Sequence, residues 1–148
     1  MSEIIKVGMA DLKVCKSPNG VTTLGLGSCV GIAIRDPASK VGGLAHIMLP
    51  DSTVIRNNSN IPKFADTGIE ALVKQVVAAG ANRGRLVAKI AGGAKMFAFS
   101  TNSEMMGVGD RNVEAVRRKL QQLKIPILAS DTGKNYGRTV IFYPETGD

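Results

Sequence analysis

Short apolar runs follow one another in the first third of the chain. They cover residues 21–26, 29–34 and 41–49, with turn-forming residues 35–37 between the second and third runs and Pro50 after the last. Continuous apolar runs of this length are typical of strands that are buried on both faces. The pattern therefore predicts three buried strands in succession.

Helical spacing replaces this pattern in the middle of the chain. One apolar stripe recurs at helical intervals and consists of Ile69, Leu72, Val73, Val76 and Val77. Thr67 and Glu70 have the spacing of a capping box. Pro62 favours an earlier start, and Gly80 is a suitable end. A second stripe begins after Asp110 and consists of Val113, Val116, Leu120 and Leu123.

Further strands are predicted on either side of the second helix. The segments that predict them are 86–91, 125–129 and 139–143. The segments predicted as loops or turns are 51–60, 94–109 and 131–137. Because strands outnumber helices, we expect an α/β fold, a single-domain sandwich of mixed β-sheet with two main helices over residues 1–148.

Composition narrows the class of protein. The formal net charge is +7, which favours partners with negative surfaces. Aromatic residues make up only 4% of the chain, so base stacking is poorly supported, and a solvated basic surface is the simpler interpretation. The 2 cysteines do not make a disulfide scaffold, and no apolar stretch reaches the roughly 20 residues of a spanning helix. We expect a soluble cytoplasmic protein with neither a nucleic-acid partner nor membrane insertion.

The chain has 1 histidine, His46, which lies inside the apolar run 41–49. A site with several histidine ligands is therefore impossible, and no close pair of cysteines compensates, so we predict no metal. A lone histidine in an apolar strand is most often a core residue that bonds a backbone carbonyl. If the protein uses an imidazole as an acid or base, however, that residue is His46.

Cys29 lies in a glycine-rich turn. Glycines at positions 25, 27 and 31 leave room for a substrate and for backbone amides that stabilise an oxyanion. Cys15 lacks this setting and fits the role of a small buried apolar residue.

A hydrolytic dyad of Cys29 and His46 is reasonable on neighbouring strands, with an imidazolium stabilising the thiolate. A third group should orient the imidazole, and Thr23 and several aspartates are candidates.

Neither glycine-rich stretch fits a nucleotide site. Val30 stands where a dinucleotide fingerprint needs glycine, and no helix is predicted after it. The stretch at 92–95 lacks the spacing of a P-loop. We therefore predict no bound cofactor.

A family resemblance rests mainly on two segments, TLGLGSCV at residues 23–30 and GLAHIMLP at residues 43–50. Weaker matches follow at 89–97, 109–113 and 131–133. Together these segments resemble the chemoreceptor glutamine deamidase family of bacterial and archaeal chemotaxis, known as CheD. The resemblance implies an α/β sandwich that acts as a cysteine hydrolase and converts glutamines of methyl-accepting chemotaxis receptors to glutamate.

The resemblance also implies site residues and a partner. It matches the nucleophile of the family with Cys29, the histidine with His46 and the threonine with Thr23. It further implies a CheC-type chemotaxis phosphatase as a partner. A non-catalytic module that regulates the receptor or the phosphatase by binding is the alternative, and release of ammonia from the receptor would distinguish the two functions.

Overall fold

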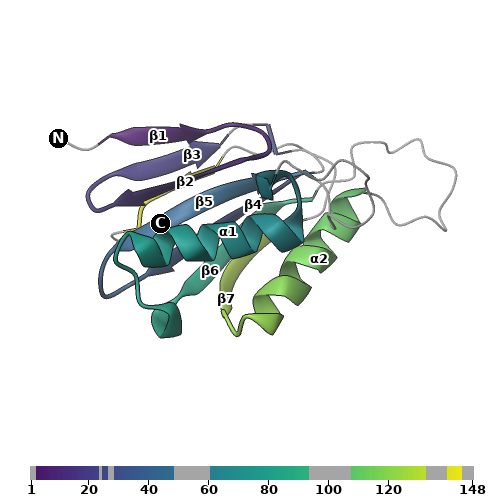
Figure 1. Cartoon of the computed structure of the whole chain (residues 1–148). Coiled ribbons are helices and arrows are strands. Elements are labelled where there is room, and N and C mark those ends of the chain that lie inside the picture. Colours follow the sequence, from purple (N-terminus) through teal and green to yellow (C-terminus); the bar gives the residue numbers. More distant parts are fainter. Residues whose placement is uncertain are drawn as a thin grey trace, which may run out of the picture.

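The chain folds into three layers, which are a three-stranded sheet, a five-stranded sheet and a pair of helices (Figure 1). The structure, a computed structural model, describes residues 3–23, 25–26, 29–48, 61–93, 108–132 and 140–144. The strands within these residues are β1 (Ile4–Val7), β2 (Asp11–Lys16), β3 (Gly20–Thr23), β4 (Val30–Asp36), β5 (Val41–Ile47), β6 (Val87–Gly92), β7 (Ile127–Thr132) and β8 (Val140–Phe142). The helices are α1 (Ala65–Ala78) and α2 (Val108–Gln122), with short 3-10 helices η2 (Ile61–Lys63) and η3 (Arg83–Arg85).

Both sheets contain parallel and antiparallel pairs. The five-stranded sheet has the order β2-β5-β4-β6-β7, and its β6–β7 pair is parallel while the other pairs are antiparallel. The three-stranded sheet has the order β1-β3-β8, in which β1 is parallel and β8 antiparallel to β3. This architecture confirms the α/β sandwich of mixed β-sheet with two main helices.

The five-stranded sheet lies in the middle, so its central strands are buried on both faces. Alternate residues of a strand point to opposite sides. In β4, Ile32 and Ile34 pack in the cluster shared with the helices, whereas Ala33 packs toward the three-stranded sheet. The cluster between the sheets, here called the inter-sheet core, consists of Val7, Cys15, Val21, Ala33, Leu44 and Phe142. The prediction of doubly buried strands is confirmed for β4 and β5.

The apolar stripes of both helices pack against the five-stranded sheet. The stripe residues with 0% exposure are Ile69, Leu72, Val76, Val116 and Leu120. Val77, at the edge of the first stripe, is 39% exposed. Because burial of one aliphatic side chain contributes about 1.5–3 kcal/mol, the stripes are sufficient to hold both helices on the sheet.

The predicted capping box at Thr67 is wrong. Helix α1 begins at Ala65, and its N-cap residue, Phe64, makes no side-chain capping bond. Thr67 lies inside the first turn, and its hydroxyl donates instead to the carbonyl of Ile61 at 2.7 Å. Phe64 has 0% exposure, so burial of its ring decides where the helix starts. Gly80 follows the helix with φ +120°, as expected for a residue that ends it.

Several strand boundaries differ from the prediction. Strand β3 ends at Thr23 and not at residue 26, and β7 continues through Thr132, where we had expected a turn from residue 131. Strands β1 and β2 were not predicted, because both are short and carry charged residues between the apolar ones. The loop predicted at 51–60, most of that at 94–109 and most of the connection at 131–137 lie outside the described residues.

A buried carboxylate holds the turn after β4. Asp36 has 0% exposure and accepts bonds from Arg85 Nε at 3.0 Å and Nη2 at 2.8 Å. It also accepts from the backbone N–H groups of Ala38 at 2.9 Å and Asn82 at 2.8 Å. The Arg85 guanidinium holds the pKa of Asp36 well below its usual range. This network fixes η3 beside the end of β4. Among the described residues, no helix is long and apolar enough to cross a membrane.

Candidate active site

Backbone contacts from β6 fix the position of Cys29, immediately before β4. The N–H of Gly93 donates to the Cys29 carbonyl at 2.8 Å. Gly92 and Gly93 have φ values of +108° and +69°, in the left-handed region that favours glycine. A Cβ on Gly92 would collide with the Cys29 carbonyl oxygen, and one on Gly93 with Val113 of α2. Gly92 therefore lets the end of β6 approach the backbone of Cys29 closely, and Gly93 makes room for α2. We had considered this pair only as a possible phosphate loop.

His46 lies in β5 with 0% exposure. Its Nδ1 is 2.7 Å from the hydroxyl of Thr23, which belongs to β3 in the other sheet. The same hydroxyl lies 2.8 Å from the carbonyl oxygen of Val7 in β1. Neither Thr23, at 1% exposure, nor His46 is accessible to bulk water. The side chains of Thr23 and His46 thus meet between the two sheets, as the sequence prediction required of an orienting group.

The hydroxyl of Thr23 has one proton, and its two contacts determine where that proton points. A carbonyl oxygen only accepts, so the short contact with Val7 requires Thr23 to donate to it. The hydroxyl oxygen then accepts from His46, which places the imidazole proton on Nδ1. Nε2 is left as the unprotonated nitrogen, and it has no hydrogen-bond partner among the described residues. A buried imidazole with a free acceptor nitrogen differs from a structural histidine that is fully satisfied.

The sheet register brings His46 of β5 next to the segment that follows Cys29. His46 is the register partner of Gly31, which is two positions after Cys29. Cys29 lies in the bend before the first residue of β4, so the alternation of the strand does not by itself fix the direction of its side chain. Among the described residues His46 Nε2 has no hydrogen-bond partner, so the Cys29 thiol does not bond the imidazole in this structure. Cys29 is 9% exposed, which makes it the more accessible of the two.

The glycines near Cys29 have different roles. Gly25 has φ +67° and nothing within 4 Å of the position of a Cβ, so its conformation alone favours glycine. Gly31 was expected to leave room for a substrate, but a Cβ there would meet Leu26 Cδ1 at 3.1 Å. Leu26 has 0% exposure, and its side chain takes up part of the space beside Gly31. Gly27 lies outside the described residues.

Burial shifts both titrating groups toward their neutral forms. Desolvation raises the pKa of the Cys29 thiol above its ordinary value, and a backbone hydrogen bond opposes the shift only in part. Desolvation also lowers the pKa of His46. Both shifts favour the neutral thiol and the neutral imidazole over their charged forms. A neutral imidazole with a free ring nitrogen is chemically able to accept a thiol proton.

Two further residues complete the surroundings. Cys15 lies in β2 with its Sγ 3.5 Å from the Asn19 carbonyl oxygen, and burial raises its pKa to about 11. It belongs to the inter-sheet core, in agreement with its predicted apolar role. Asn112, which we did not predict, donates from Nδ2 to the Met48 carbonyl at 3.0 Å and ties α2 to the end of β5. The signal was present, since Asn112 lies four positions before Val116 in the apolar stripe.

Comparisons with known proteins agree with this architecture and with the sequence motifs. A family model described as CheD, chemotactic sensory transduction, matches residues 48–148. The chain is 64% identical over 148 residues to the probable chemoreceptor glutamine deamidase CheD of Lachnoclostridium phytofermentans, covering 100% of this chain and 92% of that protein. It is 52% identical over 147 residues to the chemoreceptor glutamine deamidase CheD of Halalkalibacterium halodurans, covering 99% of this chain and 91% of that protein.

A solved structure extends the comparison to the fold alone. A crystal structure of a Neisseria meningitidis protein from family DUF152 matches with a TM-score of 0.55 at 10% identity, covering 95% of this chain and 74% of that one. The two sequence relatives, in contrast, are similar enough over nearly the whole chain to establish membership of the same family. The chain belongs to the CheD family.

Proposed function

We propose that this protein hydrolyses the side-chain amides of specific glutamines in methyl-accepting chemotaxis receptors, forming glutamate and ammonia. Membership of a family whose relatives carry the name chemoreceptor glutamine deamidase supports the substrate and the reaction. The observation that supports the mechanism is the contact between Thr23 and His46, because it leaves a buried Nε2 that has no hydrogen-bond partner among the described residues.

In the first half of the reaction, the Cys29 sulfur attacks the side-chain carbonyl carbon of the glutamine. The thiol proton moves to His46 Nε2 as the carbon–sulfur bond forms. Backbone N–H groups near Cys29 would stabilise the negative oxygen of the tetrahedral intermediate. His46 then gives its proton to the amide nitrogen, the carbon–nitrogen bond breaks, and ammonia leaves a thioester behind.

In the second half, His46 removes a proton from water as the water oxygen attacks the thioester carbon. The carbon–sulfur bond breaks, and the proton returns to the Cys29 sulfur. The product is a glutamate side chain, and the site returns to the neutral pair that burial favours. No step requires a metal or an organic cofactor.

Thr23 is the positioning residue in this scheme. Its hydroxyl holds Nδ1 and so keeps Nε2 available for proton transfer in both halves. A neutral hydroxyl stabilises the transient imidazolium less than a buried carboxylate would. The site therefore depends on orientation more than on an opposing charge.

The biological setting belongs to the same proposal. Residues 1–148 act as one catalytic domain in the cytoplasm, where the signalling regions of the receptors are expected. A CheC-type chemotaxis phosphatase would bind the protein and compete with the receptor.

Mass spectrometry of a receptor cytoplasmic fragment tests the function directly. Incubation with the protein should convert particular glutamines to glutamate and release ammonia. Cys29→Ala and His46→Ala should each abolish conversion while thermal unfolding shows a folded protein, since nucleophile and base act as a unit. Cys15→Ala, the matched control, should retain most of the activity. Tight receptor binding without conversion would instead favour the regulatory binding module.

A further inference from the structure

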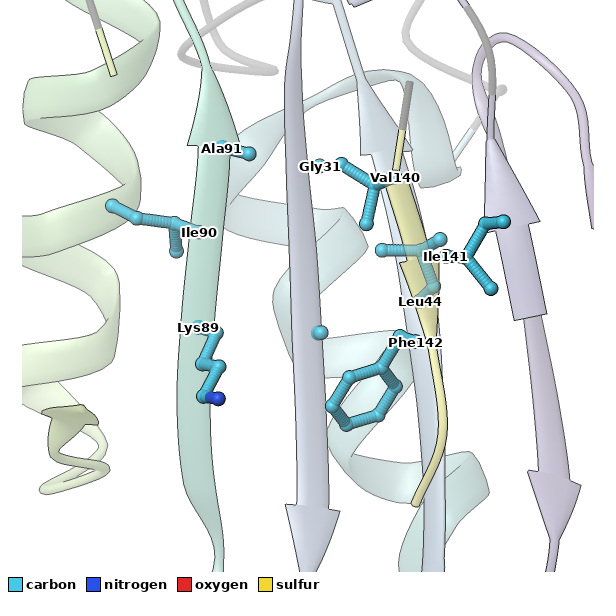
Figure 2. Close-up of a pocket in the computed structure, with 9 residues that line it drawn as sticks. Gly31, Leu44, Lys89, Ile90, Ala91, Val140, Ile141 and Phe142 are labelled. Carbon is cyan, nitrogen blue, oxygen red and sulfur yellow. The ribbon is translucent and has the colours of Figure 1, made fainter. Parts of the chain in front are cut away.

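A pocket of about 90 Å³ opens beside the candidate active site, between β8 and the β4–β6 pair (Figure 2). Its floor includes Gly31 and Ala33 of β4 and Ala91 of β6, and β8 contributes Val140 and Phe142 as a wall. The pocket exists because the floor positions carry small side chains or none. Since 8 of the 9 lining residues are apolar, the pocket suits an apolar group.

The pocket extends along the strands, away from the position of His46. Gly31, Ala91 and Val140 lie at one end, and Lys89 and Phe142 lie at the other (Figure 2). Gly31 is also the register partner of His46, so this end adjoins the proposed site. Two residues along a strand span about 7 Å, which sets the distance between the two ends.

Lys89 is the charged residue among those that line the pocket. It lies in β6 beside Ala33, and its half-buried side chain leaves the strand on the pocket side (Figure 2). Within the described ranges, its ammonium makes no ion pair, whereas Lys119 pairs with Glu70 and Arg85 with Asp36. Thus a positive charge lies at the far end of an apolar pocket.

We infer that this pocket binds an apolar side chain of the substrate polypeptide close to the reactive glutamine, and that Lys89 pairs with a substrate carboxylate beside it. The inference rests on the proposed function and adds to it a determinant of which glutamines are chosen. It commits to the substrate as occupant because the pocket begins at Gly31, opposite His46, and because Lys89 supplies a complementary charge for an acidic chain.

Size and spacing fit this occupant. An apolar cavity of about 150 Å³ holds a benzene molecule, so about 90 Å³ suits a branched aliphatic side chain. Side chains one turn apart on a helix lie roughly 5–6 Å from each other, close to the length of the pocket. A glutamine at Cys29 and an aliphatic residue one helical turn away would occupy the two positions together.

Two kinds of variant test the inference on the full chain. Lys89→Glu replaces an attraction by a repulsion and should raise KM for a receptor fragment roughly tenfold, with kcat little changed. Lys16→Glu is the matched control, since Lys16 is exposed at the end of β2 and the change in net charge is the same. Ala33→Leu and Ala91→Leu fill the pocket and should also raise KM about tenfold, which corresponds to loss of one buried aliphatic side chain. Thermal melts identify any variant that does not fold.

A double-mutant cycle on the substrate makes the test specific. Each acidic residue near a converted glutamine is changed to its amide and assayed with wild type and with Lys89→Gln. At one substrate position, the change to the amide should raise KM with wild type but have little effect on KM with Lys89→Gln. The reason is that the substrate carboxylate has no positive charge to pair with in that variant. Additive effects at every position, with unchanged KM in the pocket variants, would overturn the inference while leaving the deamidase function intact.

A binding measurement separates the inference from the chemistry. Cys29→Ala protein and a fluorescent receptor fragment should bind, and the further change Lys89→Glu should weaken that binding by a similar factor. If wild type converts no glutamine, the proposed function fails, yet this measurement still decides whether the pocket contacts the receptor. The inference is contradicted if the fragment does not bind, or if its affinity is the same for Lys89→Glu and for the pocket variants as for the parent protein.

Discussion

Replacing Thr23 by valine would remove the hydroxyl that orients His46 while nearly preserving the shape of the side chain. The hydroxyl bonds the Val7 carbonyl at 2.8 Å and His46 Nδ1 at 2.7 Å. With exposures of 4% for Val7 and 0% for His46, water does not readily replace it. A buried polar group left unpaired costs about 1–3 kcal/mol, so two of them lower the free energy of unfolding by about 2–6 kcal/mol. For a chain of this length, the melting temperature should fall by about 5–15 °C.

The effect on catalysis should exceed the effect on stability. Without Thr23 as its acceptor, the Nδ1 proton is no longer favoured, and the tautomer with the proton on Nε2 cannot take the thiol proton. General acid–base catalysis contributes roughly 10²–10⁴-fold, so kcat for deamidation should fall about 10²-fold while KM changes little. Thr23→Ala should act in the same direction, and Thr23→Ser, which keeps the hydroxyl, should retain much of the activity.

Nitrogen NMR of the imidazole provides a direct assay because the chain has 1 histidine. The ¹⁵N shifts of the wild type should show a protonated Nδ1 and a free Nε2, and Thr23→Val should change that pattern. Thr22 offers a matched control, since its hydroxyl donates to the Val140 carbonyl at 2.7 Å and does not contact His46. Thr22→Val or Thr22→Ala should lower stability by about 1 kcal/mol and leave the shifts unchanged. The proposed hydrogen-bond direction would be refuted if the wild type carries its imidazole proton on Nε2, or if Thr23→Val leaves the ¹⁵N shifts unchanged.

Three further predictions address charge, burial and pH. The net charge is +7 and receptor signalling domains are expected to be acidic, so raising the salt concentration should increase KM for deamidation and leave kcat nearly constant. A KM that does not change with salt would contradict this prediction. Asp36→Ala should lower the free energy of unfolding by about 3–5 kcal/mol in denaturant titrations. The change leaves the N–H groups of Ala38 and Asn82 unpaired and removes the partner of Arg85. A loss below about 1 kcal/mol would show that the fold does not depend on this network. The pKa of His46 is lowered in the folded protein, so the unfolded chain takes up the proton first as pH falls below 6.5, and stability should decrease there. His46→Gln should reduce this pH dependence in thermal melts, and an unchanged slope would mean that another group causes it.

The central elements of the fold could be predicted because their signals are local. The runs at 29–34 and 41–49 became β4 and β5 within a few residues, and the second stripe became α2. The start of α1 could not be read from local rules. Thr67 and Glu70 satisfy the capping pattern, yet burial of Phe64 moved the helix start upstream. Tertiary packing overrode a local preference worth about 1 kcal/mol.

The sequence suggested residues for the candidate site but not their arrangement. Cys29 and His46 stand out by type and surroundings, and the family resemblance favoured Thr23 over Thr22. In the structure, Thr22 and Thr23 have equally clear partners, and only their direction differs. The partner that orders the Thr23 hydroxyl is a backbone carbonyl of β1, a strand that the sequence pattern did not reveal. Backbone groups are the same at every residue, so the sequence does not indicate which carbonyl accepts the Thr23 proton. The fold determines it.

The contact between Thr23 and His46 depends on how the two sheets pack against each other. Thr23 belongs to the three-stranded sheet and His46 to the five-stranded sheet, so the bond spans the boundary between them. The two sheets are held there by the inter-sheet core, which is much smaller than the cluster that holds the helices. Opening of the smaller cluster would separate Thr23 from His46, while Cys29 keeps its backbone bond to Gly93, the residue after β6. The packing between the two sheets therefore determines the contact between Thr23 and His46, whereas the backbone bond from Gly93 holds Cys29.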